Sequence, residues 1–103
     1  MVLYVMKWEI GPDVDAYKAW TSSAIERLLK APGVVEFRAY RAVAGSGQVV
    51  ATYEFDDMHA CGAWLDDVVV RQVREELEAL ASNVTAEIWG PSPIVPDPIR
   101  PGS

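Results

Sequence analysis

Residues 35–55 read VEFRAYRAVAGSGQVVATYEF, and this stretch decides the fold. On both sides of a central segment of small residues, apolar side chains alternate with mostly polar ones, which is the period of two that a β-strand imposes. The alternation covers residues 35–40 and 49–55, and residues 44–48 (AGSGQ) have the flexible composition of a hairpin connection. We therefore expect two neighbouring antiparallel strands.

The chain before this hairpin predicts one strand and one helix. Residues 3–10 alternate with the same period, and the glycine and proline of residues 11–13 (GPD) end that strand. Asp13 is a suitable N-cap, because its carboxylate can accept hydrogen bonds from the free amides of a first helical turn. Apolar residues then recur at helical spacing as far as Lys30, and residues 32–33 (PG) end the helix.

The chain after the hairpin predicts a broken helix and a last strand. Helical spacing follows the acidic residues 56–57 and is interrupted at Asp66 and Asp67, a cap-like pair that three β-branched valines follow. We therefore expect two helical pieces and then a fourth strand over residues 84–89.

Five prolines mark the end of the chain as a tail outside the domain. Proline removes amide donors and favours extended backbone. Because the tail also carries Ile94, Val95 and Ile99, it is either mobile or docked on a neighbouring subunit. We expect one domain over residues 1–90 and a Pro-rich tail over residues 91–103.

The order β-α-β-β-α-β is that of the ferredoxin-like α+β fold, with a four-stranded antiparallel sheet and two helical regions on one face. Strand parity turns mainly aromatic and aliphatic side chains toward the helices. The opposite face mixes charged and apolar side chains: Leu3, Val5, Lys7, Glu9, Glu36, Arg38, Tyr40, Val50, Thr52, Glu54, Thr85, Glu87 and Trp89. This apolar content predicts a homodimer packed through the sheet face, a dimeric α/β barrel. A monomer with a solvated sheet face is the alternative.

Composition narrows the classes of partner and the compartment. The net charge of -6 opposes binding to nucleic acid or to an anionic membrane. Cys61 is the single cysteine, so an intrachain disulfide is impossible and a reducing compartment, the cytoplasm, is expected. The chain shows neither a signal peptide nor a long apolar segment, and one histidine with one cysteine provides no metal-ligand spacing.

The segment 53–57 (YEFDD) leading into 63–68 (AWLDDV) resembles the antibiotic-biosynthesis monooxygenase-like family of dimeric α/β barrels. In that family the third strand commonly ends in an aromatic residue followed by acidic ones, and the second helical region is broken after a leucine. The resemblance covers residues 2–90 and implies the same fold. It also implies one of the family's activities, which include cofactor-independent oxygenation of polycyclic phenols and quinols and the degradation of haem.

The haem-degrading branch of the family uses an asparagine in the first strand, a tryptophan in the second helix and a haem-ligating histidine about three turns later. Trp64 matches the tryptophan, whereas the asparagine position falls on or near Lys7 and Trp8. The histidine position falls on Arg74, whose charged guanidinium cannot ligate haem iron. We therefore expect neither haem nor another cofactor.

His59 is the candidate catalytic residue, because it is the only side chain whose ordinary pKa allows proton transfer near neutral pH. The simpler interpretation is an exposed residue at a helix start. Trp8, Tyr53 and Trp64 are the candidate substrate-binding residues, since with Trp20 and Phe55 they converge on the helix-facing side of the sheet. Such aromatic clusters also occur as plain core.

Two functions follow as hypotheses. The first is a cofactor-independent monooxygenase acting on an aromatic small molecule, a phenol, quinol or polycyclic compound, with His59 as base and Trp64 stacked on the ring. The second is a non-catalytic homodimer that binds a small apolar ligand or serves as an accessory protein.

Overall fold

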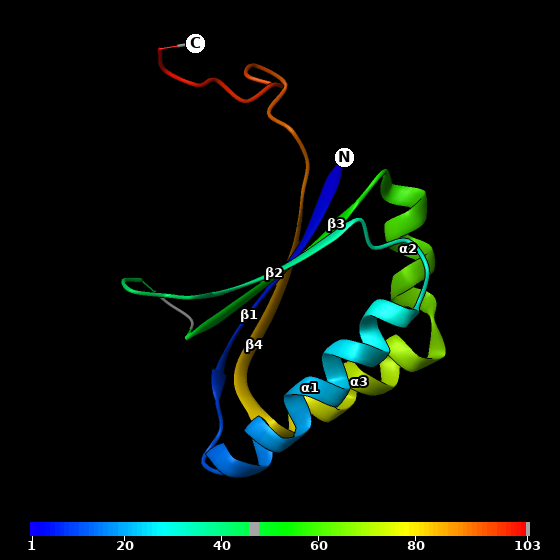
Figure 1. The fold of residues 1–103 in the computed structure, drawn as a ribbon, viewed down its shortest axis with the longest axis vertical. Coiled ribbons are helices and arrows are strands. Elements are labelled where there is room, and N and C mark those ends of the chain that lie inside the picture. Colours follow the sequence, from blue (N-terminus) through cyan, green and yellow to red (C-terminus); the bar gives the residue numbers. More distant parts are fainter. Residues whose placement is uncertain (46–47, 103) are drawn as a thin grey trace.

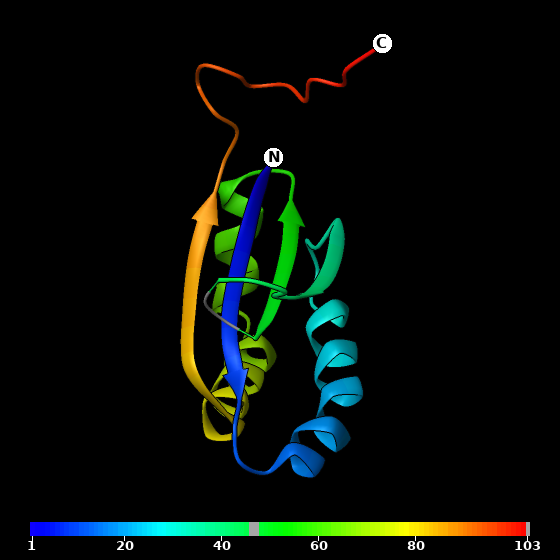
Figure 2. The same cartoon turned by 90° about the vertical axis from the view of Figure 1, so that its left-hand side faces the viewer.

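The computed structural model of the chain describes residues 1–45 and 48–102. Its strands form one sheet in the order β2-β3-β1-β4, in which every neighbouring pair is antiparallel. The helices lie together on one face (Figure 1), and the other face is open toward the viewer in Figure 2. The predicted ferredoxin-like α+β fold is confirmed. The elements are β1 (Val2–Ile10), α1 (Val14–Lys30), β2 (Glu36–Arg41), β3 (Val49–Phe55), α2 (Met58–Asp66), α3 (Val68–Leu80) and β4 (Ala81–Trp89).

Aspartate side chains begin all the helices of the described chain. Asp13 accepts a hydrogen bond from the Ala16 amide at 3.0 Å, which confirms the predicted N-cap of α1. Asp67 accepts from the first amides of α3, while its own amide donates to the Trp64 carbonyl at the end of α2. The predicted break in the second helical region is therefore real, and one residue serves both helix ends.

The fourth strand differs from its prediction. β4 begins at Ala81, ahead of the expected range 84–89, because pairing with β1 continues around a bulge between Lys7 and Glu9. Asn83 takes a positive φ of 53°, which asparagine tolerates better than most residues, and its amide donates to the Glu9 carboxylate at 2.7 Å. The sequence signal was weak because serine and asparagine are poor strand formers.

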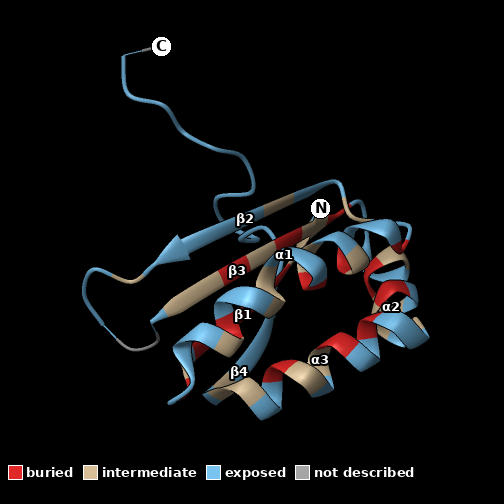
Figure 3. Cartoon of the chain, turned by 60° about the horizontal axis from the view of Figure 1, so that its bottom comes forward, coloured by how far each residue is buried: buried red, intermediate tan, exposed pale blue. Residues whose placement is uncertain are grey.

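The core lies between the helices and the two central strands. The prediction from strand parity is confirmed for β1 and β3, where alternate residues such as Tyr4, Met6 and Tyr53 are buried. Ala39 and Ile88 share this face but lie on the edge strands and are exposed. Figure 3 shows the reason, since the helices cover the middle of the sheet and leave β2 largely exposed.

The C-terminal tail leaves the sheet after β4 and extends away from the domain (Figure 1). Ile94 and Ile99 are 88% and 79% exposed, so these apolar side chains are open in a single chain. Both predictions for the tail, mobility and docking on a second subunit, stay open. In the described part of the chain, none of the helices has the length and apolar character needed to cross a membrane.

A charged cluster joins α1 to α3. The two terminal guanidinium nitrogens of Arg27 donate to the two oxygens of Glu76, at 2.6 and 3.0 Å, and the Trp20 indole donates to the same carboxylate at 2.7 Å. These hydrogen bonds lower the pKa of Glu76 to about 2. A bidentate pair that is two-thirds shielded from water holds the helices in register better than an exposed pair does.

This cluster predicts a pH-dependent stability. Because the pKa of folded Glu76 lies below its ordinary value of 4.5, the pair stabilises the fold above that pH, and the contribution is lost as the pH falls toward 2. We expect Glu76→Gln to lower the free energy of unfolding at pH 7 by about 1 kcal/mol and to flatten the acid dependence. Urea denaturation at pH 7 and pH 3 measures both.

Glu26→Gln is the matched control, because it removes the same charge from an exposed ion pair. Glu26 pairs with Lys30 at 3.3 Å on the surface of α1. The substitution should change the free energy of unfolding by less than about 0.5 kcal/mol. An acid dependence in Glu76→Gln as steep as that of the unmodified protein would contradict the assignment.

Candidate functional site

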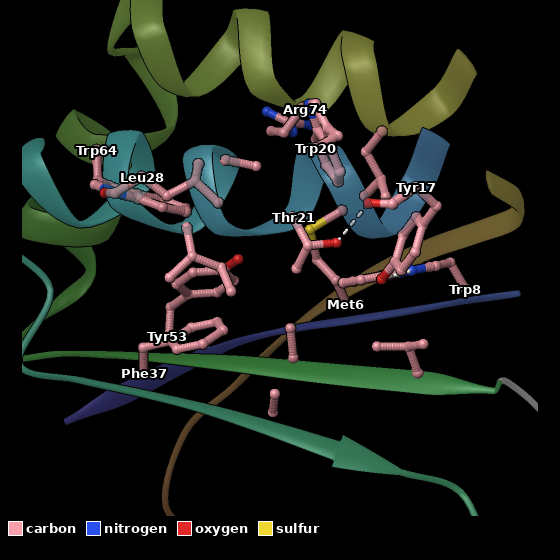
Figure 4. Close-up of a pocket in the computed structure, with 16 residues that line it drawn as sticks. Met6, Trp8, Tyr17, Trp20, Thr21, Leu28, Phe37, Tyr53, Trp64 and Arg74 are labelled. Carbon is pink, nitrogen blue, oxygen red and sulfur yellow. Dashed lines mark hydrogen bonds between the residues drawn. The ribbon is translucent and has the colours of Figure 1, made fainter. Parts of the chain in front are cut away.

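A cavity lies between the sheet and helices α1 and α3, in the middle of the core (Figure 4). Its volume is about 80 Å³, taken as the space open to the centre of a water molecule. The wall is mainly apolar and aromatic. It consists of Met6, Trp8, Tyr17, Trp20, Thr21, Ala24, Ile25, Leu28, Phe37, Ala39, Val49, Ala51, Tyr53, Trp64, Arg74 and Leu77.

The structure brings together the three predicted substrate-binding residues. Trp8, Tyr53 and Trp64 all line the cavity, and the Tyr53 and Trp64 rings are 4.8 Å apart between centroids. Each tryptophan has a partner for its indole: Trp8 donates to the Tyr17 hydroxyl at 3.1 Å and Trp64 to the Leu28 carbonyl at 3.0 Å. These three residues belong to the core and also line the cavity, so a ligand in the cavity would contact their rings.

The predicted catalytic residue lies elsewhere. His59 is exposed on the first turn of α2 and does not line the cavity. The buried residues of α2 are Cys61 and Trp64, and a residue two positions before Cys61 projects from nearly the opposite side of a helix. The position of His59 therefore gives no support to a base acting on a ligand in this cavity, and its catalytic role stays a prediction.

Two polar residues of the site were not among the predicted site residues, although the family resemblance placed one of them, Arg74, at the position of a haem-ligating histidine. Arg74 is the charged member of the described cavity wall, and the Tyr4 hydroxyl is buried beside the wall without a hydrogen-bond partner. Burial raises the pKa of Tyr4, and Arg74 opposes this effect. The available signal was that Arg74 directly follows the buried Val73 and precedes the buried Leu77 by three residues, at the border of the apolar face of α3.

Burial favours the neutral forms of two further groups of the core, Tyr53 and Cys61. Burial raises the pKa of the Tyr53 hydroxyl, with smaller contributions from Tyr4 and Tyr17. Burial also raises the pKa of the Cys61 thiol, which makes a reactive thiolate unfavourable. Among residues 1–45 and 48–102, no three histidine, cysteine or acidic side chains are grouped so that they would hold a metal ion.

The unpartnered hydroxyl makes a testable difference between two tyrosines. Tyr4→Phe removes a buried hydroxyl that has no partner, so we expect the free energy of unfolding to stay the same or to rise by about 1 kcal/mol. Tyr17→Phe removes the acceptor of the Trp8 indole and should lower it by about 1 kcal/mol. Urea denaturation compares the two, and equal destabilisation by both substitutions would contradict the geometry.

No protein-family model matches the sequence, and no curated protein is similar to it in sequence. Solved structures do share the fold. A variant of SnoaB, a cofactor-independent oxygenase from Streptomyces nogalater, aligns over 93% of this chain and 97% of its own, with 16% identity and a TM-score of 0.74. A protein from Deinococcus radiodurans, provisionally named an antibiotic biosynthesis monooxygenase, aligns over 97% of each chain, with 15% identity and a TM-score of 0.73.

A dimeric ferredoxin-like protein of unknown function from Thermobifida fusca is also similar. It aligns over 85% of this chain and 88% of its own, with 13% identity and a TM-score of 0.70. The resemblance to antibiotic biosynthesis monooxygenases is thus confirmed, and at these identities it is a likeness of fold.

Proposed function

We propose that this chain is a cofactor-independent, monooxygenase-like enzyme that acts on an aromatic small molecule, a phenol, quinol or polycyclic compound, in the cavity between helices and sheet. The observation that carries the proposal is the aromatic wall, in which Trp8, Tyr53 and Trp64 line one cavity. The likeness of fold to an oxygenase that works without a cofactor supports the class of chemistry.

The size of the cavity limits how the ligand sits. A water molecule needs roughly 10–15 Å³ by this measure, so 80 Å³ has room for a few waters or for part of one ring. Phe37, Ala39 and Val49 on the sheet side are at least partly exposed, and so are Trp20, Thr21, Ile25 and Arg74 on the helices, which we take as the mouth. We expect a polycyclic ligand to insert one edge between the aromatic walls and to displace the Trp20 side chain at the mouth.

In the proposed reaction the ligand supplies the electrons. An ionised phenol or quinol reduces dioxygen, and a ring methylene becomes a carbonyl. One oxygen atom enters the product, and the other leaves as water with the two hydrogens of the methylene. The protein's part is to hold the ring, to exclude bulk water and to favour the ionised ligand, which are contributions of position and electrostatics.

Oxygen uptake tests the activity. With a panel of polycyclic phenols and quinols, we expect substrate-dependent oxygen consumption without added metal or flavin. Ile25→Trp narrows the mouth of the cavity and should reduce the rate about tenfold or more, a barrier change of about 1.4 kcal/mol. His59→Ala, outside the cavity, should keep the rate.

Circular dichroism shows whether each variant is folded. If no member of the panel raises oxygen consumption, or if Ile25→Trp matches the unmodified protein, the proposal fails. A tenfold loss in His59→Ala would instead restore the original assignment of the base.

A non-catalytic function is the second candidate, and one observation favours it. No histidine or carboxylate lines the cavity in the described chain, so the wall offers no group whose ordinary pKa is near neutral. The chain would then be a small-molecule-binding or accessory protein. Tight binding of the same phenols without oxygen consumption would select this candidate.

We also propose that the chain forms a homodimer through the open face of the sheet. Val5 on this face is 1% exposed in a single chain, although it is separate from the main core, and Leu3, Val50 and Trp89 surround it. A second copy would cover the apolar side chains that stay exposed around Val5, Tyr40 at 46% and Trp89 at 45%, and would pair the surrounding charges. The Thermobifida fusca protein of the same fold is described as dimeric.

The dimer predicts a mass of twice one chain in gel filtration with light scattering. Val50→Glu places a charge at the centre of the open face and should give a monomer, because an unpaired charge is costly to bury. Gln72→Glu adds the same charge on the exposed side of α3 and should stay dimeric. An unmodified protein that is monomeric at micromolar concentration would refute the assembly.

A further inference from the structure

Arg74 is a cation at an aromatic cavity, and it has no carboxylate partner among residues 1–45 and 48–102. Glu78 lies at the spacing typical of helical ion pairs, and both Glu75 and Glu78 share a surface groove with Arg74. Nevertheless, Arg74 forms no ion pair or hydrogen bond with any described residue. Arg71, three residues earlier on the same helix, pairs instead with Asp66, at 3.4 Å.

The cavity has tyrosine hydroxyls that are free to donate a hydrogen bond to a ligand. The Tyr53 hydroxyl makes no hydrogen bond within the described chain, and the Tyr4 hydroxyl is buried without a partner. The Tyr4 ring packs against the wall residues Tyr53 and Trp64, at 6.1 and 5.9 Å between centroids. The Tyr17 hydroxyl already accepts from Trp8. A buried polar group without a partner is costly and calls for an explanation.

We propose that Arg74 recognises an ionised oxygen on the aromatic ligand, so that the cavity selects phenolates over neutral phenols and their ethers. Figure 4 shows Arg74 and Trp20 on the helix side of the cavity, above the rings that rise from the sheet. A ring held between those walls can therefore direct a substituent toward the guanidinium. The inference rests on the ligand site of the proposed function but does not require turnover.

Electrostatics favours this reading of Arg74. Arginine is the cation best suited to anion recognition in proteins, and the partly buried position of Arg74 strengthens its attraction for an anion relative to water. The anion would be bound after losing its proton to solvent, so no base is needed among the wall residues. This removes the difficulty that the cavity has no histidine or carboxylate.

The charged and titratable groups around Arg74 leave the ligand as the group that titrates near neutral pH. From β1, Tyr4 has a pKa raised by burial. Across the cavity mouth, α1 contributes the uncharged Trp20, Thr21 and Ile25, while its Arg27 is paired with Glu76. On α3 itself the neighbours are Arg71, Glu75 and Glu78, residue types whose ordinary pKa values lie far from 7.

Binding of 4-nitrophenol tests the proposal, because its ionised and neutral forms absorb at different wavelengths. We expect the protein to bind the phenolate and to lower the apparent pKa of the bound probe by about one unit, a tenfold preference for the ionised form. Arg74→Gln should abolish this shift. Arg74→Lys, which keeps the charge, should retain part of it.

Arg71→Gln is the matched control, since Arg71 is exposed on the same helix and does not line the cavity. It should behave as the unmodified protein does. The neutral ether 4-nitroanisole should bind the unmodified protein and Arg74→Gln equally, which also shows that the variant cavity is intact.

Three results would overturn the proposal: an unchanged shift in Arg74→Gln, an equal loss in Arg71→Gln, or no binding of the phenolate to the unmodified protein at millimolar concentration. Oxygen consumption is not a readout, so the two proposals fail separately. A phenolate-selective protein that consumes no oxygen keeps this inference, and an active enzyme whose selectivity is unchanged in Arg74→Gln loses it.

Discussion

The packing of the Trp64 ring is the contact on which the rest of the structure depends. Its centroid lies 5.9 Å from the Tyr4 ring, 4.8 Å from the Tyr53 ring and 5.3 Å from the Phe55 ring, and its indole donates to the Leu28 carbonyl. One side chain of α2 thereby contacts both central strands and α1. Aromatic contacts of this kind combine a large buried area with preferred geometries, so they fix the distance between helices and sheet.

The cavity follows from that distance. Large rings hold the layers apart at two places, Trp64 with Tyr53 at one end of the cavity and Trp8 with Tyr17 at the other (Figure 4). Between them the wall includes the small side chains of Ala24, Ala39 and Ala51, which leave the space unfilled. A void in a protein interior is costly because its lining loses packing contacts. Here the void has one charged wall residue in the described chain, the partly exposed Arg74, and the proposed ligand site rests on this combination.

The two faces of the sheet divide the molecule's tasks. The helix-facing side holds the cavity and the aromatic rings, whereas the open side groups the apolar Leu3, Val5 and Val50 with arginine and glutamate side chains. The same alternation of side chains along β1 and β3 produces both faces, since successive residues in a strand point in opposite directions. The proposed ligand site and the proposed dimer face therefore use adjacent residues of the same two strands, and a change of register by one residue would disrupt both.

The sequence by itself determined the order of elements, the capping aspartates, the helix break at Asp67 and the aromatic residues of the cavity wall, because each depends on local spacing or on strand parity. Only the tertiary structure decided the start of β4, the absence of His59 from the cavity and the presence of Arg74 in it. Those outcomes depend on how much of the sheet the helices cover. They also depend on the direction in which a side chain points when it lies at the edge of a helix's apolar face. Such distances are set by the packing of rings from four separate elements, so no local pattern contains them.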